Sequence, residues 1–270
     1  MEVRLSRPNR VAQHNGDVLS RDEFIYTGTV SALEEDSRYR LAQLTGERAS
    51  ILDVGCAVGY IGEFLRRNPP QRWLGGIELD ARAAIQARPH YDQLIVGSIE
   101  EPEVWGRLER KVDAMIFGDV LEHTADPVRV LQMAASHLRD DGIVVVSMPN
   151  VAHVKVRLRL LFGRFDYEDW GIMDRTHLRF FTRQTAQTML RDAGFEVLHS
   201  EAIRGFSQLK GGSAIQRYGR TARARVRNFL VKIWPTMFAK QFIHVGIRLR
   251  DRERERQDPV VGSATKSSTV

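Results

Sequence analysis

Residues that could carry chemistry are first concentrated in the stretch ILDVGCAVGYIGEFL, residues 51–65. An apolar run ends at Asp53, then Gly55 and Gly59 follow, and an apolar-periodic segment continues from there. This pattern predicts a strand, a glycine-containing turn and the start of a helix. Such turns hold nucleotide-type ligands against a helix N-terminus, so we expect a cofactor of that kind here.

A dinucleotide fits this turn poorly. Its fingerprint, Gly-x-Gly-x-x-Gly, would begin at Gly55 and would place Ala57 and Tyr60 at the other two glycine positions. The Tyr60 side chain would crowd the contact between helix and sheet that the third glycine permits. Asp53 would also repel a pyrophosphate at the mouth of the strand, by roughly 1 kcal/mol or more at contact distance.

S-adenosyl-L-methionine fits better, because it has no phosphate and carries an ammonium and a sulfonium cation. Asp53 attracts these positive groups, and Gly55 and Gly59 let the backbone approach closely. Glu78, at the end of the next predicted strand, can accept hydrogen bonds from both ribose hydroxyls, although NAD offers the same hydroxyls. A purely structural turn, with Asp53 as a helix cap, is the plain alternative. The acids of FGDVLEH, residues 117–123, favour the cofactor over that alternative.

These residues need a scaffold, and the rest of the chain alternates between apolar runs and helix-periodic segments. Strands are expected at 50–54, 72–80, 93–101, 112–123, 143–150, 196–203 and 241–250. Helices are expected at 24–46, just after residue 80, and at 126–142 and 182–195. This alternation predicts an α/β fold with a doubly wound, mostly parallel sheet.

Length and composition are those of one domain with an appendage. The chain has 270 residues, 43% of them hydrophobic, which suffices for a sizeable core. Cys56 is the single cysteine, so an intramolecular disulfide is excluded and a reducing compartment is expected. The sequence has no signal-peptide core and no run of about 18 apolar residues, so we expect a cytoplasmic protein.

Five motifs carry a resemblance to a known family: LDVGCAVG, GIELD, VGSIEE, FGDVLEHTADP and GIVVVSMPN. In their order and spacing, roughly over residues 30–200, the chain resembles the class I S-adenosylmethionine-dependent methyltransferases. The resemblance implies a seven-stranded Rossmann-like sheet with an antiparallel edge strand, S-adenosyl-L-methionine as cofactor, and methyl transfer as the activity. It also implies cofactor-binding residues at the methionine end, the ribose and adenine, and the sulfonium: Asp53, Gly55, Cys56, Ala57 and Gly59; Glu78, Leu79, Ser98 and Ile99; Asp119 and Val120.

Two residues depart from the family pattern. Ala57 stands where a glycine is usual, which costs little if its φ is negative. Ser98 stands where an aspartate often takes the adenine amine, and a hydroxyl accepts that bond less strongly.

Methyl transfer from a sulfonium is a direct displacement, so the protein supplies alignment and, for a hydroxyl acceptor, a base. The predicted bases are His123, after the fourth strand, and His177, in the polar-aromatic stretch DRTHLRFFT. His153 is a further candidate, and any of the three can instead be a hydrogen-bonded structural histidine. No metal site is predicted, because no ligand pattern fits the spacing of the nearby acids Asp119, Glu122 and Asp126.

Positive charge is concentrated in residues 202–250, which hold eleven Lys or Arg and no acid, in a chain of net charge +6. Residues 217–234 in this block are typical of a basic amphipathic helix. Three roles stay open: a solvated outer face, a peripheral contact with the inner membrane surface, or RNA binding. Residues 154–164 add four basic residues near the expected active-site rim, which favours a phosphorylated or lipid-linked acceptor.

The expected organisation is an N-terminal arm with a leading helix (1–46), a methyltransferase domain (47–250) with a basic helical insertion (202–240), and a disordered tail (251–270). DRTHLRFFT, with LLFGRFDY before it and WPTMFAKQF after it, resembles a bacterial subgroup linked to sugar, glycan or cell-envelope biosynthesis. We therefore predict methylation of a small molecule, sugar or glycan intermediate at oxygen, with no nucleic-acid partner. The alternatives are an RNA methyltransferase and a non-catalytic binding scaffold with the same fold.

Overall fold

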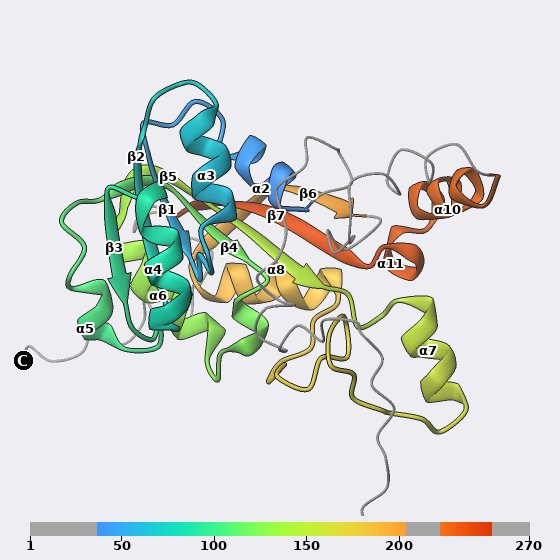
Figure 1. Ribbon diagram of the computed structural model, residues 1–270. Coiled ribbons are helices and arrows are strands. Elements are labelled where there is room, and N and C mark those ends of the chain that lie inside the picture. The colour runs from blue at the N-terminus through green and yellow to red at the C-terminus, as the bar shows by residue number, and fades with distance from the viewer. Residues whose placement is uncertain (1–36, 204–221, 250–270) are drawn as a thin grey trace, which may run out of the picture.

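The computed structural model describes residues 37–203 and 222–249, and its centre is one seven-stranded sheet (Figure 1). The strand order is β3-β2-β1-β4-β5-β7-β6. All pairings from β3 to β5 are parallel, while β7 runs antiparallel between β5 and the edge strand β6. The strands are β1 (Ser50–Val54), β2 (Trp73–Glu78), β3 (Gln93–Val96), β4 (Val112–Gly118), β5 (Leu138–Pro149), β6 (Phe195–Ile203) and β7 (Gln241–Arg248).

Helices cover both faces of the sheet, as the doubly wound prediction requires. Alternate residues of β1 and β4 point to opposite faces, because side chains alternate along a strand. Leu52 and Met115 pack with α5, α6 and α8, whereas Ile51 and Ile116 pack with α2, α3 and the end of α4. The helices are α2 (Ser37–Leu44), α3 (Tyr60–Arg67), α4 (Ala81–Ala87), α5 (Pro102–Trp105), α6 (Pro127–Ser136), α7 (Val154–Leu161), α8 (Arg183–Asp192), α10 (Ala222–Ile233) and α11 (Pro235–Phe238), with 3-10 turns η1 (Arg88–His90) and η2 (Leu121–His123).

The fold class is confirmed, and the antiparallel strand lies one position in from the edge of the sheet. The expected helix at 126–142 is too long: it ends at Ser136, because Leu138 joins the sheet opposite Val112. In α4, Ile85 is exposed, whereas Ala83, Ala84 and Ala87 are buried. Helix α7 was not expected.

Several predicted segments lie wholly or partly outside the described residues. These are the arm and the start of the leading helix, residues 204–221 of the insertion, and the tail from 250 onwards. Within the insertion the structure has α10, where Val226, Phe229 and Ile233 are exposed while Val231 packs with Ala239 and Phe242. No helix of the described ranges is long and apolar enough to cross a membrane.

Candidate active site

The glycine turn joins β1 to α3 at the point where the strand order reverses, between β1 and β4. Ligands of open α/β sheets bind at this point, beyond the carboxyl ends of the strands. The amides of Gly55 and Cys56 both donate to the Ile77 carbonyl, at 2.8 and 3.0 Å. Gly55 has a φ of 72°, and a Cβ there would lie 2.4 Å from the Val120 side chain. Only glycine fits this position, because the turn lies directly against the segment that follows β4.

Asp53 lies beneath the turn and is buried. Its carboxylate accepts a hydrogen bond of 2.6 Å from the Tyr91 hydroxyl, which in turn accepts one from the Gly62 amide. Burial raises the Asp53 pKa to about 7, the Tyr91 hydrogen bond opposes this rise, and the Glu78 charge adds to it. Asp53 therefore connects β1 to the segment after α4. Nothing in the sequence identified Tyr91 as the partner of Asp53.

Glu78 closes the turn from the second strand. Its carboxylate accepts hydrogen bonds from the amides of Ala57, at 2.8 Å, and Asp80, at 2.9 Å. The condition under which Ala57 would be harmless is not met, because its φ is +50°. A left-handed alanine costs about 1–2 kcal/mol, so the Glu78 carboxylate holds a strained turn in place.

The residues expected around an adenine are spread along the same edge of the sheet. Leu79 follows β2 and is 70% exposed, which leaves its side chain available to a flat ligand. Ser98 and Ile99 follow β3 and are partly buried. The Ser98 hydroxyl accepts a hydrogen bond from the Glu100 amide, and the Ile99 carbonyl accepts one from the Trp105 indole. Their contacts with a cofactor stay predictions.

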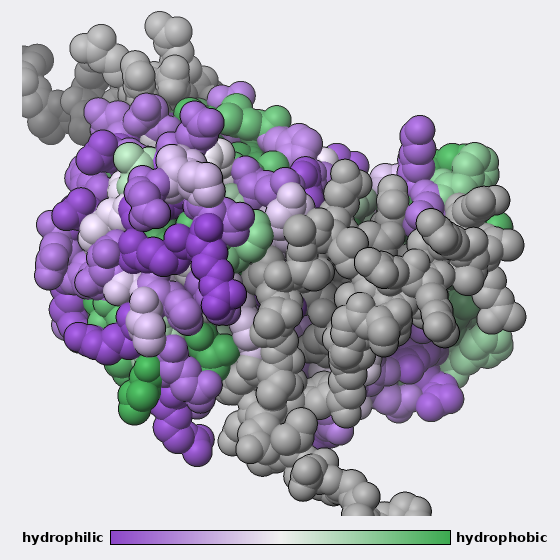
Figure 2. Space-filling view, turned by 45° about the horizontal axis from the view of Figure 1, so that its top comes forward, coloured by the Kyte–Doolittle hydropathy of each residue, from purple (hydrophilic) through white to green (hydrophobic). Residues whose placement is uncertain are grey.

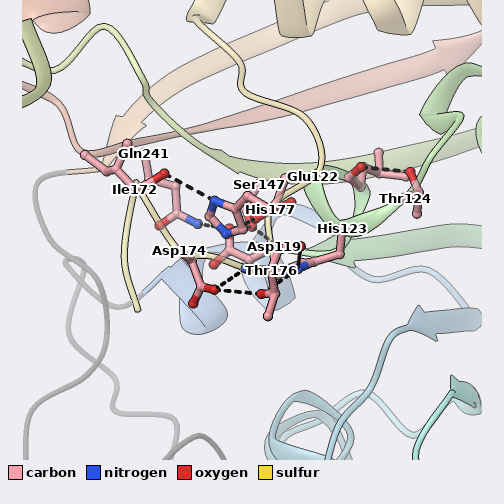
Figure 3. A network of polar contacts seen from close by, with 11 residues as sticks. Asp119, Glu122, His123, Thr124, Ser147, Ile172, Asp174, Thr176, His177 and Gln241 are labelled. Atoms are coloured by element: carbon pink, nitrogen blue, oxygen red, sulfur yellow. Dashed lines mark hydrogen bonds and ion pairs between the residues drawn. The ribbon is translucent and has the colours of Figure 1, made fainter. Parts of the chain in front are cut away.

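Asp119 directly follows β4 and is the acid that the family resemblance predicts beside the sulfonium. It has a φ of 55°, and its carboxylate accepts hydrogen bonds from the Ser147 hydroxyl and from the Gln241 amide group (Figure 3). Burial raises the Asp119 pKa, and these two hydrogen bonds oppose the rise. Strands β5 and β7 thus orient this carboxylate, and neither Ser147 nor Gln241 was identified from the sequence.

The two predicted histidines lie side by side, although they are distant in sequence: His123 ends η2 and His177 lies in the segment between α7 and α8. These two segments form what we call the rim of the site. The His123 and His177 rings meet edge to face, with centroids 4.8 Å apart (Figure 3). The His123 ring is exposed and its Nδ1 lies 3.2 Å from the Thr176 carbonyl. The His177 ring is buried and its Nδ1 lies 3.2 Å from the Ile172 carbonyl. Burial lowers the His177 pKa, so this imidazole is neutral.

His153, the third candidate, has a structural task. Its Nδ1 accepts a hydrogen bond from the Lys155 amide and caps the N-terminus of α7. Burial lowers the His153 pKa to about 4. A neutral imidazole with this tautomer suits a helix cap, so the structure gives no support to His153 as a base.

The charge at the switch point fits a cationic ligand. Asp53, Glu78 and Asp119 lie at the ends of three neighbouring strands, β1, β2 and β4, and so bring three carboxyl groups to the same edge of the sheet. A pyrophosphate would meet repulsion from this set, whereas a sulfonium and an ammonium group are attracted by it. The residues present therefore fit S-adenosylmethionine, whose sulfonium supplies an activated methyl group.

A sequence model described as a methyltransferase domain matches residues 29–200, which is more than half of the chain. The chain belongs to the methyltransferase-domain family. It is a class I S-adenosylmethionine-dependent methyltransferase, and S-adenosylmethionine is its cofactor.

The names of similar proteins indicate different substrates. The methyltransferase is 26% identical over 217 residues to the tRNA 5-carboxymethoxyuridine methyltransferase of Escherichia coli K12, covering 77% of this chain and 83% of that one. It is 25% identical over 174 residues to a ubiquinone biosynthesis O-methyltransferase of Neisseria meningitidis, covering 60% and 69%. A solved S-adenosylmethionine-dependent methyltransferase of Archaeoglobus fulgidus shares the fold, with a TM-score of 0.53, 14% identity and coverage of 78% and 92%.

Proposed function

We propose that this methyltransferase transfers the methyl group to an oxygen atom of a small molecule, sugar or glycan intermediate. The observation that carries the proposal is the pair of histidines beside Asp119. A hydroxyl must lose its proton as the methyl group arrives, and a neutral imidazole can receive that proton. The exposed His123 ring reaches solvent and is the group that would touch the acceptor, with the buried His177 ring supporting it from behind.

The surroundings of the rim support an acceptor with an apolar or a phosphorylated part. Helix α7 and the turn after it project from the domain on the side that carries the rim segment (Figure 1). This projection exposes Leu161 and Phe162 next to basic side chains such as Arg157. On the side with α7 and α10, hydrophobic surface adjoins strongly hydrophilic surface (Figure 2). A lipid-linked or phosphorylated acceptor suits such a surface, and the membrane contact through 217–234 stays a prediction.

RNA is the second candidate acceptor. It is favoured by the relative named for tRNA, which aligns over 77% of this chain. Basic residues of α7 and of the 202–250 block would then contact phosphates, and affinity would fall steeply with salt. The expectation that nucleic acid is not a partner is therefore open. The family match favours an enzyme over the non-catalytic scaffold.

The test supplies the purified protein with methyl-labelled S-adenosylmethionine and separated fractions of a cell extract: small molecules, lipids and RNA. We expect the labelled methyl group to enter the small-molecule or lipid fraction, in a product with a methyl ether or ester. Label that enters RNA and is released by ribonuclease would transfer the assignment to the second candidate. An N-methyl product in any fraction would refute oxygen as the acceptor atom.

A further inference from the structure

Three potential metal ligands meet on the rim. Glu122 and His123 come from η2, and His177 comes from the segment between α7 and α8. Each offers one donor atom, and these atoms all lie within 4.8 Å of one another (Figure 3). No spacing in the sequence indicates this set, because the third ligand is far along the chain from the first two.

The Glu122 carboxylate needs a partner. Its residue is 1% exposed, and neither side-chain oxygen has a hydrogen-bond partner within the described residues. A buried carboxylate without partners costs several kcal/mol as an ion. A cation is the partner that would remove this cost.

Both histidines present the correct nitrogen for a metal. A carbonyl oxygen only accepts, so the Nδ1 atoms that contact the Ile172 and Thr176 carbonyls carry the protons. The Nε2 atoms of His177 and His123 then keep their lone pairs. Metal-ligating histidines show this arrangement, with the other ring nitrogen donating to a carbonyl or carboxylate.

The distance between His177 and Glu122 also suits a shared cation, whereas the widest pair of the set, within 4.8 Å, would have to close slightly around it. His177 Nε2 lies 4.0 Å from Glu122 Oε1, which is too long for a hydrogen bond. Two atoms that bind one cation at about 2.0–2.2 Å each lie roughly 3–4 Å apart. A lone pair facing a carboxylate oxygen at this distance is unfavourable with nothing between them and favourable around a metal ion.

We propose that Glu122, His123 and His177 bind a divalent transition cation such as Zn²⁺, Mn²⁺ or Co²⁺. Two imidazole nitrogens and one carboxylate favour these ions over Mg²⁺ and Ca²⁺, which prefer all-oxygen sites. Three protein ligands leave at least one coordination position for an oxygen of the acceptor. This last step rests on the proposed function: the cation would make a bound hydroxyl easier to deprotonate. The proton would pass to solvent water, because the Nε2 lone pairs of both histidines would be held by the cation, and His123 would then act as a ligand in place of the base.

The experiment measures cation binding alone, without cofactor or acceptor. Full-length protein is freed of metal with a chelator and titrated with Zn²⁺, Mn²⁺ and Mg²⁺ by calorimetry, and Co²⁺ binding is followed by visible absorption. The proposal expects one saturable equivalent of the transition ions and weaker or no binding of Mg²⁺. Glu122→Gln and His177→Gln should each weaken binding by at least about tenfold.

His199→Gln is the matched control, because it removes an exposed histidine that also contacts a glutamate, Glu201, at 3.2 Å. It should leave the bound equivalent unchanged. His123→Gln replaces an exposed side chain, so it keeps the test valid if the buried variants fail to fold. No binding to the wild type, or equal loss in the control, would overturn the metal site.

Binding of S-adenosylhomocysteine to the same samples reports the cofactor turn separately. Cofactor binding without cation binding refutes the metal site and leaves the methyltransferase proposal standing. Cation binding combined with an N-methylated product supports the metal site and refutes the acceptor oxygen.

Discussion

Asp53→Asn should make the protein more stable at pH 8 and change how its stability depends on pH. Asp53 is buried, and its pKa is raised from an ordinary 3.8 to about 7. Between these two values the folded chain keeps a proton that the unfolded chain releases, so the free energy of unfolding falls as pH rises. At about 1.36 kcal/mol per pH unit, the full penalty reaches roughly 4 kcal/mol above pH 7. Asparagine carries no such penalty, and its amide oxygen still accepts from the Tyr91 hydroxyl.

The assay is urea unfolding of wild type and Asp53→Asn at pH 5, 6, 7 and 8 and constant ionic strength. The stability difference between them should grow in favour of the variant across this series, because all other titrating groups cancel. Tyr91→Phe is the companion variant: it removes the hydrogen bond that favours the charged carboxylate, so the Asp53 pKa should rise further and the stability should keep falling to a higher pH than in the wild type. A difference that stays constant from pH 5 to 8 would refute the raised pKa.

Three further outcomes are expected. Ala57→Gly should stabilise the protein by up to about 1 kcal/mol in urea unfolding, because it removes the strain of a φ of +50° but adds freedom to the unfolded chain; a loss of stability would contradict the strain. Glu78→Ala should weaken S-adenosylhomocysteine binding at least about tenfold by calorimetry and lower stability by about 1–3 kcal/mol, since two amides lose their acceptor, whereas Glu63→Ala, on the helix that follows the turn, should do neither. His244, buried with its pKa lowered to about 4, should cost up to about 3 kcal/mol of stability as pH falls from 6.5 to 4, and His244→Leu should abolish this acid sensitivity in thermal melts at matched pH.

The sheet was predictable because strands that are buried on both faces consist mainly of apolar residues. Runs such as 50–54 and 143–150 are apolar on both faces, and the structure buries both. The helix expected at 182–195 is present, and Thr182 forms a capping box with Thr185 at its start. The predicted secondary structure was wrong where a contact between residues distant in sequence determines the local conformation. The segment after Ser136 follows a helical pattern, yet Leu138 pairs with Val112.

Helix α7 shows a second limit of pattern analysis. Its apolar residues alternate with a period of two, which is typical of a strand, and only Val156 is buried. The helix is started instead by the His153 side chain as N-cap. With so little of its surface in the core, neither periodicity nor burial predicts its conformation.

For the site, the sequence identified residues that lie at strand ends, because those ends must meet at one edge of the sheet. It missed their partners, which come from other elements: Tyr91 under Asp53, and Ser147 and Gln241 on Asp119. A hydrogen bond between distant residues has no period and no spacing, so only the folded chain reveals it. The same limit hid the convergence of the three proposed metal ligands.

Backbone hydrogen bonds hold the rim in addition to the contacts that the His123 and His177 rings make with the Thr176 and Ile172 carbonyls. The Glu122 carbonyl accepts hydrogen bonds from the amides of Leu178 and Arg179, and the Arg179 side chain donates to the Ala125 carbonyl. The segment that carries His177 is thereby attached to the turn that carries Glu122 and His123. Because these bonds do not involve the three ligand side chains, replacing a ligand should leave the rim in place. A loss of cation binding in the variants would then report missing ligands and not a displaced segment.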